Sequence, residues 1–345
     1  MFNKKSKFEL RKDLDKESFQ RITCSFYRYC AIDNPEGLRN QLYQDLSDLK
    51  ILGRVYVAEE GINAQISVPD HKWDSFKDYI DTSSILKGMK LKKAVQEGLS
   101  FLKLTIKVKE EIVAYNLPKD TYDMNKVGKH LSAQEFNASI DQNDAIVVDI
   151  RNYYESEVGK FEGAITPDVD RSKELLPEVA QLLADKKDKK LHLYCTGGIR
   201  CEKASSYLLK QGFKEVYQLD GGIVQYAHDI KRENLPSKFI GKNFVFDNRL
   251  GEKVTNHIIG KCHQCGHKAD SHTNCANDAC HILFIQCDNC KTTYNGCCSE
   301  DCKDFAQLDI QTQKELRKDV TKTVSSSKLS SKIKPKLYQL FNYWK

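Results

Sequence analysis

A cysteine at the end of an apolar segment is the residue of this chain best suited to nucleophilic chemistry. Cys195 directly follows the apolar segment 191–194. The loop after it consists of Thr196, Gly197, Gly198, Ile199 and Arg200. The glycines let backbone N–H groups point inward, the next helix adds partial positive charge, and the arginine adds guanidinium donors. We therefore expect a cradled thiolate at the tip of the loop, rather than a small apolar core cysteine.

This cradle predicts chemistry on sulfur or on an anionic substrate, with Cys195 as the nucleophile and Arg200 closing the ring of donors. Cys201 follows the arginine directly, and two interpretations of it stay open. It could resolve a disulfide or persulfide on Cys195, or it could be a buried helix cysteine that points away. His192, inside the apolar segment, is interpreted as a core histidine rather than a catalytic base.

A second chemical signal lies downstream, where nine of the thirteen cysteines fall between Cys262 and Cys302. The pairs Cys262/Cys265 and Cys287/Cys290 each enclose two residues, a spacing that places two thiolates on one metal ion. Two such pairs form a tetrahedral zinc site. The sequence therefore predicts structural zinc, with oxidised disulfides and free thiols as the alternatives.

The remaining five cysteines of this segment could complete a second four-cysteine site and leave one residue over. They are Cys275, Cys280, Cys297, Cys298 and Cys302. We assign the second site to Cys275, Cys280, Cys298 and Cys302, although spacing alone does not fix the pairing among the nine. Four histidines of the same segment could substitute as ligands, namely His263, His267, His272 and His281.

The composition is that of a globular protein with more than one domain. The chain has 345 residues and a mass of 39.6 kDa, with 40% hydrophobic and 30% charged residues and a mean hydropathy of −0.57. These values exclude a single small module and a wholly disordered chain. Residues 1–17 are charged where a signal peptide is apolar, and no apolar run is long enough to span a membrane. We therefore expect a cytoplasmic protein without membrane insertion.

Basic charge is concentrated at the C-terminal end. The formal net charge is +6, while residues 314–345 hold nine Lys or Arg against two acidic residues. Such a tail favours a polyanionic partner such as RNA, with a merely solubilising role as the alternative. The aromatic residues at its end, among them Tyr338 and Trp344, could stack on bases or dock on the protein's own surface.

The apolar periodicity of the first 118 residues predicts a β-α-β-β-α-β order. Strands are expected over 22–32, 54–58, 62–68 and 101–116, and helices over 34–50 and 71–80. This order is that of a ferredoxin-like, or acylphosphatase-like, domain over residues 1–118.

From residue 119 the pattern changes to buried strands that alternate with helices. Strands are expected over 145–151, 190–195 and 213–222. This alternation predicts an α/β domain over 119–238, with a parallel sheet covered on both faces. Residues 239–305 contain too few large apolar residues to form a core unaided, so we expect bound metal to stabilise this cysteine-rich module. Residues 306–345 form the basic tail.

Three ordered motifs resemble the rhodanese superfamily. They are VVDIRNYYESEVGKFEGAI (147–165), YCTGGIR (194–200) and YQLDGGI (217–223). The resemblance implies that Asp149 and Arg151 are supporting residues near the active loop. Four residues separate Cys195 from Arg200, as in the sulfur-type loop of this superfamily, whereas related phosphatases have one more. Phosphatase activity is therefore disfavoured.

Further motifs are similar to the rhodanese-like tRNA uridine hydroxylase family over residues 22–302. They are YVAEEGINAQISV (56–68), EIVAYNLP (111–118), YCTGGIRCEKAS (194–205) and NFVFDNR (243–249). This resemblance implies 5-hydroxylation of the wobble uridine of tRNA, position 34, with O2 as co-substrate. It also implies that Cys195 is required.

Two other functions stay open at this point. A cradled thiolate on a rhodanese scaffold also predicts a sulfurtransferase that passes persulfide sulfur to an acceptor. A non-catalytic RNA-binding scaffold is the third hypothesis, although an intact cysteine loop argues against it. The sequence contains no flavin or nicotinamide motif, assigns no iron site, and gives no reason to expect DNA as a partner.

Overall fold

The computed structural model describes residues 5–280 and 282–323, and these residues divide into two compact units. The first unit contains the residues up to Asn152 together with Gly163–Lys238 and Val245–Glu252. The second contains Tyr153–Glu162, Phe239–Phe244 and the residues from Lys253 onward. The chain therefore passes between the two units more than once.

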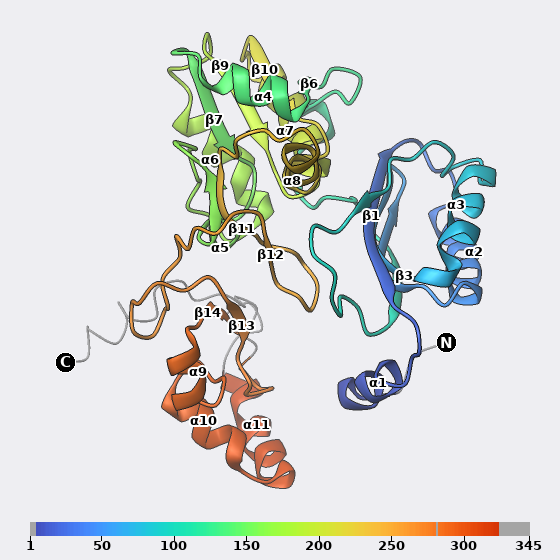
Figure 1. Ribbon diagram of the computed structural model, residues 1–345, viewed down its shortest axis with the longest axis vertical. Coiled ribbons are helices and arrows are strands. Elements are labelled where there is room, and N and C mark those ends of the chain that lie inside the picture. Colours follow the sequence, from blue (N-terminus) through green and yellow to red (C-terminus); the bar gives the residue numbers. More distant parts are fainter. Residues whose placement is uncertain (1–4, 281, 324–345) are drawn as a thin grey trace. The chain divides into compact units, whose positions relative to one another are not determined.

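The N-terminal part of the first unit is a five-stranded sheet with helices against one face (Figure 1). Its strands are β1 (Arg21–Tyr29), β2 (Leu52–Ala58), β3 (Gly61–Pro69), β4 (Lys92–Lys93) and β5 (Leu104–Val108). Its helices are α1 (Lys7–Leu14), α2 (Pro35–Asp48) and α3 (Trp73–Thr82), with short 3-10 turns η1 (Asp70–Lys72) and η2 (Lys119–Thr121). The sheet order is β4-β1-β3-β2-β5, in which only β5 runs parallel to its neighbour.

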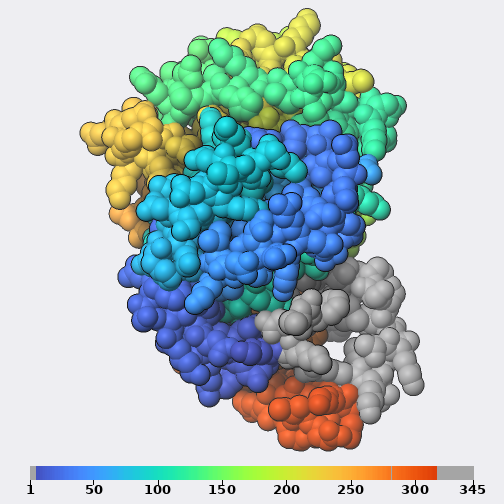
Figure 2. Space-filling view, turned by 90° about the vertical axis from the view of Figure 1, so that its right-hand side faces the viewer, coloured from blue at the N-terminus to red at the C-terminus, as the bar shows by residue number. Residues whose placement is uncertain are grey.

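Alternation of side chains divides this sheet into a core face and an open face. Phe26 of β1 is buried in one cluster with Leu42 of α2 and Phe76 of α3, whereas its neighbour Tyr27 points to the other side and is half-buried. Helices α2 and α3 cover the core face, and their outer side gives the blue and cyan surface of Figure 2. The open face is therefore free of helices of this module.

The observed elements confirm the predicted ferredoxin-like order, with two differences. The strand predicted over 101–116 is limited to β5, which pairs with β2, while the two-residue β4 lies beside β1. It is short because the chain turns after the charged residues that follow Val108, where Glu111 Oε2 accepts a hydrogen bond from Tyr115 N at 3.0 Å. Helix α1 was not predicted, and it begins at Ser6 with a capping box to Glu9.

The rest of the first unit contains the four-stranded parallel sheet that the sequence predicts. Its strands, in the order β6-β10-β9-β7, are β6 (Lys129–Leu131), β10 (Glu215–Leu219), β9 (Lys190–Tyr194) and β7 (Ala145–Asp149). Its helices are α4 (Ala133–Ile140), α6 (Ser172–Leu182), α7 (Ile199–Lys210) and α8 (Gly222–Arg232). Leu193 of β9 shares a core cluster with Leu176 of α6 and Leu208 of α7. On the other face Phe136 of α4 lies edge-on to His192, so both faces are covered.

The second unit has short elements and little apolar core. They are α5 (Tyr153–Ser156), β8 (Gly159–Phe161), β11 (Phe239–Asn243), β12 (Glu252–Lys253), β13 (His272–Asn274), β14 (Leu283–Ile285), α9 (Asp288–Thr293), α10 (Glu300–Gln307) and α11 (Ile310–Thr323). Strand β11 pairs antiparallel with β8, and β13 pairs antiparallel with β14. A small cluster around Phe284 and Ile282 is completed mainly by cysteines. This agrees with the prediction that apolar residues alone do not build this module.

The start of the basic tail continues into helix α11. The predictions about residues 324–345, including the aromatic end, concern residues outside the described ranges. Within those ranges no helix combines the length and apolar character that crossing a membrane requires.

Candidate active site and cysteine clusters

The cysteine loop joins the end of β9 to the start of α7 and is fixed by the chain that opens α8. Ile223 N donates to Cys195 O at 3.0 Å, and Val224 N donates to Thr196 O at 3.1 Å. Gly222, with φ 66°, makes this approach possible, because an added Cβ would lie 2.5 Å from Cys195 O. The YQLDGGI motif therefore has a physical role, which is to support the loop.

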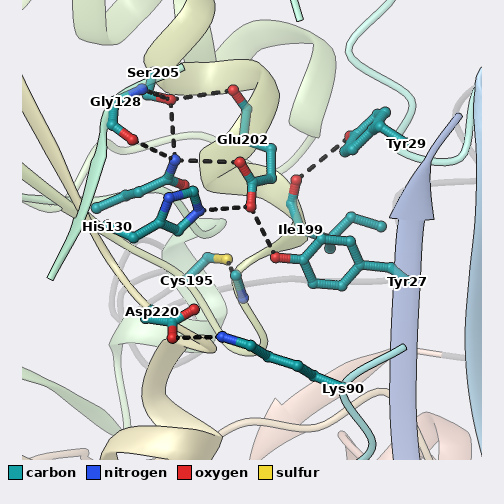
Figure 3. Close-up of polar contacts among 12 residues, drawn as sticks. Tyr27, Tyr29, Lys90, Gly128, His130, Cys195, Ile199, Glu202, Ser205 and Asp220 are labelled. Atoms are coloured by element: carbon teal, nitrogen blue, oxygen red, sulfur yellow. Dashed lines mark hydrogen bonds and ion pairs between the residues drawn. The ribbon is translucent and has the colours of Figure 1, made fainter. Parts of the chain in front are cut away.

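The sulfur of Cys195 lies inside the curled loop. Gly198 N donates to Sγ at 3.1 Å (Figure 3). Burial raises the pKa of this thiol, but a hydrogen bond with Cys201, the charge of Arg200 and backbone N–H groups outweigh burial and bring the pKa down to about 6. The thiolate is therefore the dominant form at neutral pH.

The expectation that the Cys195 side chain sits at a loop tip is wrong. The residue is fully buried and belongs to the core cluster of Leu191 and Leu193. The reason is the period of a strand, since residues 191, 193 and 195 point to the same face. Gly197 borders the cavity in front of the loop, and an added Cβ there would meet no atom within 4 Å. A substrate therefore reaches the sulfur most easily over Gly197.

The two residues that follow Ile199 both act on this sulfur. Arg200 is buried, its Nη2 donates to Thr196 Oγ1 at 3.1 Å, and its guanidinium lies 5.8 Å from the ring centre of Phe246. Cys201 is fully buried and hydrogen-bonded to Cys195. Burial and this bond raise the pKa of Cys201 well above its usual value. The interpretation of Cys201 as a cysteine pointing away from Cys195 is therefore wrong.

Asp149 and Arg151 form a buried ion pair directly behind the loop. Arg151 Nε and Nη2 donate to the two carboxylate oxygens of Asp149 at 2.8 and 2.6 Å, and neither side chain is exposed. Tyr194, the residue before the cysteine, donates its hydroxyl to the same carboxylate at 2.7 Å. The pair thus fixes the end of β9, from which the loop departs.

Glu202 is a centre of the site that sequence reasoning missed. Its carboxylate accepts hydrogen bonds from Tyr27 Oη at 3.0 Å and Gln218 Nε2 at 3.2 Å, and it bonds His130 Nε2 at 2.9 Å (Figure 3). The bond to Glu202 raises the pKa of His130. A charged residue in the buried first turn of α7 was the available signal, but its partners are distant in sequence.

Lys203 explains why three separate motifs occur together. It is fully buried, and its Nζ lies 2.8 Å from Glu60 and 3.2 Å from Glu111. Glu60 lies between β2 and β3, Glu111 follows β5, and Lys203 lies on α7. The ion pairs therefore join the N-terminal sheet to the helix that begins at the active loop.

A cavity of about 300 Å³ lies within the first unit, between the open face of the N-terminal sheet and the cysteine loop. The loop contributes Thr196, Gly197, Ile199 and Arg200. The sheet contributes Ser25, Tyr27, Arg54, Tyr56, Asn63, Gln65 and Lys92. Polar and aromatic groups thus face the region where the loop is accessible.

The cysteines of the second unit gather in two groups of four. The first group consists of Cys262, Cys265, Cys287 and Cys290, and the second of Cys275, Cys280, Cys298 and Cys302. Within each group all sulfur atoms lie within 4.8 Å of one another. The structure thus brings together the eight cysteines that the sequence assigns to metal.

The sulfur spacing fits a metal better than disulfides. Cys265 and Cys287 are 3.6 Å apart at Sγ, as are Cys280 and Cys298. Sulfurs around a tetrahedral zinc with bonds of about 2.3 Å are about 3.8 Å apart, whereas disulfide sulfurs are about 2.05 Å apart. All thirteen cysteines are free thiols, so the disulfide alternative is wrong for this structure.

The other candidate ligands of this segment lie outside the groups. Cys297 is buried beside the second group without belonging to it, as expected for the cysteine left over. His263 bonds Glu157 Oε1 at 2.7 Å, and His272 stacks edge-on against Phe244. His281 is outside the described residues. Both groups can therefore supply four thiolates without a histidine.

Comparison with known proteins identifies three regions of the chain. The model of the UPF0176 acylphosphatase like domain matches residues 21–112, that of the rhodanese-like domain matches 132–229, and that of the rhodanase C-terminal matches 240–303. Among solved structures, a thiosulfate sulfurtransferase from Pseudomonas aeruginosa is 25% identical, with a TM-score of 0.26 over 30% of this chain and 19% of that chain.

Two curated relatives resemble the chain over most of its length. A Leptospira interrogans protein named tRNA uridine(34) hydroxylase is 50% identical over 309 residues, which cover 89% of this chain and 84% of that protein. A protein of the same name from Photorhabdus laumondii is 47% identical over 319 residues, which cover 92% of this chain and 91% of that protein. With this identity, and with the cradled cysteine between two such sheets, the chain belongs to the tRNA uridine(34) hydroxylase family.

Proposed function

We propose that this chain is a tRNA-modifying enzyme that hydroxylates the wobble uridine, position 34, at C5, with Cys195 as its nucleophile. The observation that carries the proposal is the cradled thiol, whose pKa is about 6, beside a cavity of about 300 Å³. A thiolate is an effective nucleophile toward an electron-poor carbon. If Cys195 adds to C6 of uracil, the S–C6 bond forms and the C5=C6 electron pair moves toward C5 and O4. C5 is the atom that receives the hydroxyl group.

The other residues of the loop have supporting roles in this proposal. Arg200 and the backbone N–H groups of residues 196–199 keep the sulfur ionised, which the short Gly198 N to Sγ distance of 3.1 Å supports. Asp149 and Arg151 hold the end of β9, as their bidentate buried pair suggests. We assign O2 as the co-substrate on the resemblance to the hydroxylase family, and no residue is assigned to it.

We also propose that the two cysteine groups bind one structural zinc ion each. Eight thiolates at tetrahedral spacing support this assignment, and so does the small apolar core of the module. Zinc would supply stability to the module, and it takes no part in the proposed reaction.

The partner of the proposed enzyme is tRNA. The basic residues after Lys314 and the polar open face support an RNA substrate. We retain the division into 1–118, 119–238, 239–305 and 306–345, which the three matched family ranges support.

A sulfurtransferase remains the second candidate, because Cys201 lies against Cys195 and could resolve a persulfide on it. Nucleoside mass spectrometry of tRNA from cells with and without this protein separates the two. Loss of 5-hydroxyuridine supports the hydroxylase. Loss of a thiolated base with unchanged 5-hydroxyuridine would instead support the sulfurtransferase and overturn the hydroxylase proposal.

A further inference from the structure

Lys92 is a buried cation that the proposed reaction has not yet used. The residue lies in β4, it is only 8% exposed, and it lines the cavity in front of the cysteine loop. Its Nζ lies 4.2 Å from the ring centre of Tyr27. Among the described residues no hydrogen bond or ion pair of this ammonium group is found.

Other buried cations of the same unit have anionic or polar partners. Lys203 pairs with Glu60 and Glu111, and Arg151 pairs with Asp149. Burying an ammonium group without a partner is unfavourable, and burial accordingly lowers the pKa of Lys92 to about 8. A protein keeps such a group where a ligand completes it, so the lone ammonium points to an acceptor that enters the cavity.

The strand register shows which neighbours Lys92 has on the open face. Lys92 pairs with Ser25 of β1, Ser25 pairs with Gln65 of β3, and Gln65 pairs with Arg54 of β2. Directly paired residues of antiparallel strands project to the same side of a sheet. Lys92, Ser25, Gln65 and Arg54 therefore form one polar row across four strands, and all four line the cavity.

An aromatic row runs beside the polar row. Tyr27 of β1 and Tyr56 of β2 both pair with Asn63 of β3, and all three line the cavity. Lys92 lies over the Tyr27 ring, so Tyr56 is the ring left to stack on a base. Single-stranded bases are recognised by such stacking together with hydrogen bonds to their Watson–Crick edges. The two rows thus suit a pyrimidine held next to the loop.

We propose that Lys92 is a substrate-binding residue whose ammonium donates to O4 of the target uracil and so selects uridine over cytidine at position 34. This inference rests on the proposed function. An ammonium group is donor-only, whereas the Gln65 amide can turn to suit either base. Uracil presents a carbonyl oxygen at position 4, but cytosine presents an amino group there. Cytosine would leave the Lys92 ammonium buried, unpaired and facing another donor.

The test is equilibrium binding of two anticodon stem–loop RNAs that differ only in uridine or cytidine at position 34. The full-length wild-type chain is compared with Lys92→Met and Lys92→Arg. Lys90→Met is the matched control, because Lys90 is close in sequence but 79% exposed and paired with Asp220 at 2.9 Å (Figure 3). Binding is measured without O2, so no turnover contributes.

We expect the wild-type chain to prefer the uridine RNA by about 10- to 100-fold, the range for a buried group left without its partner. Lys92→Met should reduce this ratio to near one without lowering the melting temperature, while Lys92→Arg and Lys90→Met retain the preference. An unchanged ratio in Lys92→Met would overturn the inference, even if the apparent pKa of Cys195 rises. An equal loss of affinity for both RNAs would also overturn it, because the ammonium would then contact phosphate.

Failure of the proposed function gives a different result. In that case the wild-type chain forms no 5-hydroxyuridine in tRNA, while the binding ratio still decides the role of Lys92. A wild-type chain without any preference for uridine would overturn the Lys92 assignment regardless of hydroxylation.

Discussion

The hydroxyl of Tyr27 donates a hydrogen bond to Glu202 at 3.0 Å, although the two residues are 175 positions apart in the sequence. Tyr27 lies on β1 of the N-terminal sheet, and Glu202 lies in the first turn of α7, directly after the cysteine loop. The same hydroxyl packs against Gly198, where an added Cβ would lie 2.8 Å from it. The N-terminal sheet therefore helps to hold the active loop in place.

This relationship predicts a stability loss in Tyr27→Phe. Removing the hydroxyl leaves a partly buried carboxylate with one donor fewer, which should cost about 1–3 kcal/mol in the free energy of unfolding. Urea denaturation measures the change. Tyr56→Phe is the matched control, because its hydroxyl has no hydrogen bond within the described part of the chain. Equal stability of the two variants would contradict a structural role for the bond.

The pH dependence of Cys195 alkylation tests the cradle. The thiolate is the reactive form, so the rate in the wild-type chain should rise with pH and reach half its plateau near pH 6. Arg200→Ala removes a positive charge that favours the thiolate, so the midpoint should move to higher pH and the rate at pH 6 should fall. Peptide mass spectrometry identifies the modified cysteine. A midpoint that stays in place would show that Arg200 does not act on the sulfur.

The two glycines of the loop should respond differently to substitution by alanine. Gly198 has φ 94°, and its added Cβ would approach Tyr27 Oη, so Gly198→Ala should cost about 1–3 kcal/mol in stability. Gly197→Ala should leave the melting temperature unchanged, since its Cβ would point into open space, but it should lower kcat/KM by narrowing the approach to the sulfur. If Gly197→Ala kept full activity, the proposed approach over this residue would be wrong.

Metal analysis tests the cysteine groups. Protein purified under reducing conditions should contain two zinc ions per chain, and Cys290→Ser should contain one. Cys297→Ser should retain two, because Cys297 is outside both groups. Chelation should unfold the module from about residue 261 to 302 before the rhodanese-like part, since only the latter has a large apolar core. Metal-free protein that keeps the same melting profile would contradict a structural role.

The sequence predicts those features that depend on local pattern. Alternation along β1 and β9 and helical spacing in α2 and α7 determine the elements, and their order is sufficient for both sheets. The two-residue spacing of Cys262 and Cys265 indicates a metal knuckle in the same local way.

Features that depend on long-range packing could not be predicted. The partners of Glu202 and Lys203 come from the N-terminal sheet, so no local pattern announces their ion pairs and hydrogen bonds. The row that contains Lys92 depends on the register of β4, a strand of only two residues. The burial of Cys195 follows from the continued alternation of β9, which the loop motif obscured.

The most direct test of the central claim is the amount of 5-hydroxyuridine in tRNA from cells that lack their own copy of this protein and express either the wild-type chain or Cys195→Ser. Serine is chosen because Cys195 is fully buried and serine nearly preserves its volume. Equal amounts of soluble, folded protein are verified in both strains. Nucleophilic catalysis by Cys195 predicts 5-hydroxyuridine with the wild-type chain and none with Cys195→Ser. Equal amounts of 5-hydroxyuridine in the two strains would contradict it.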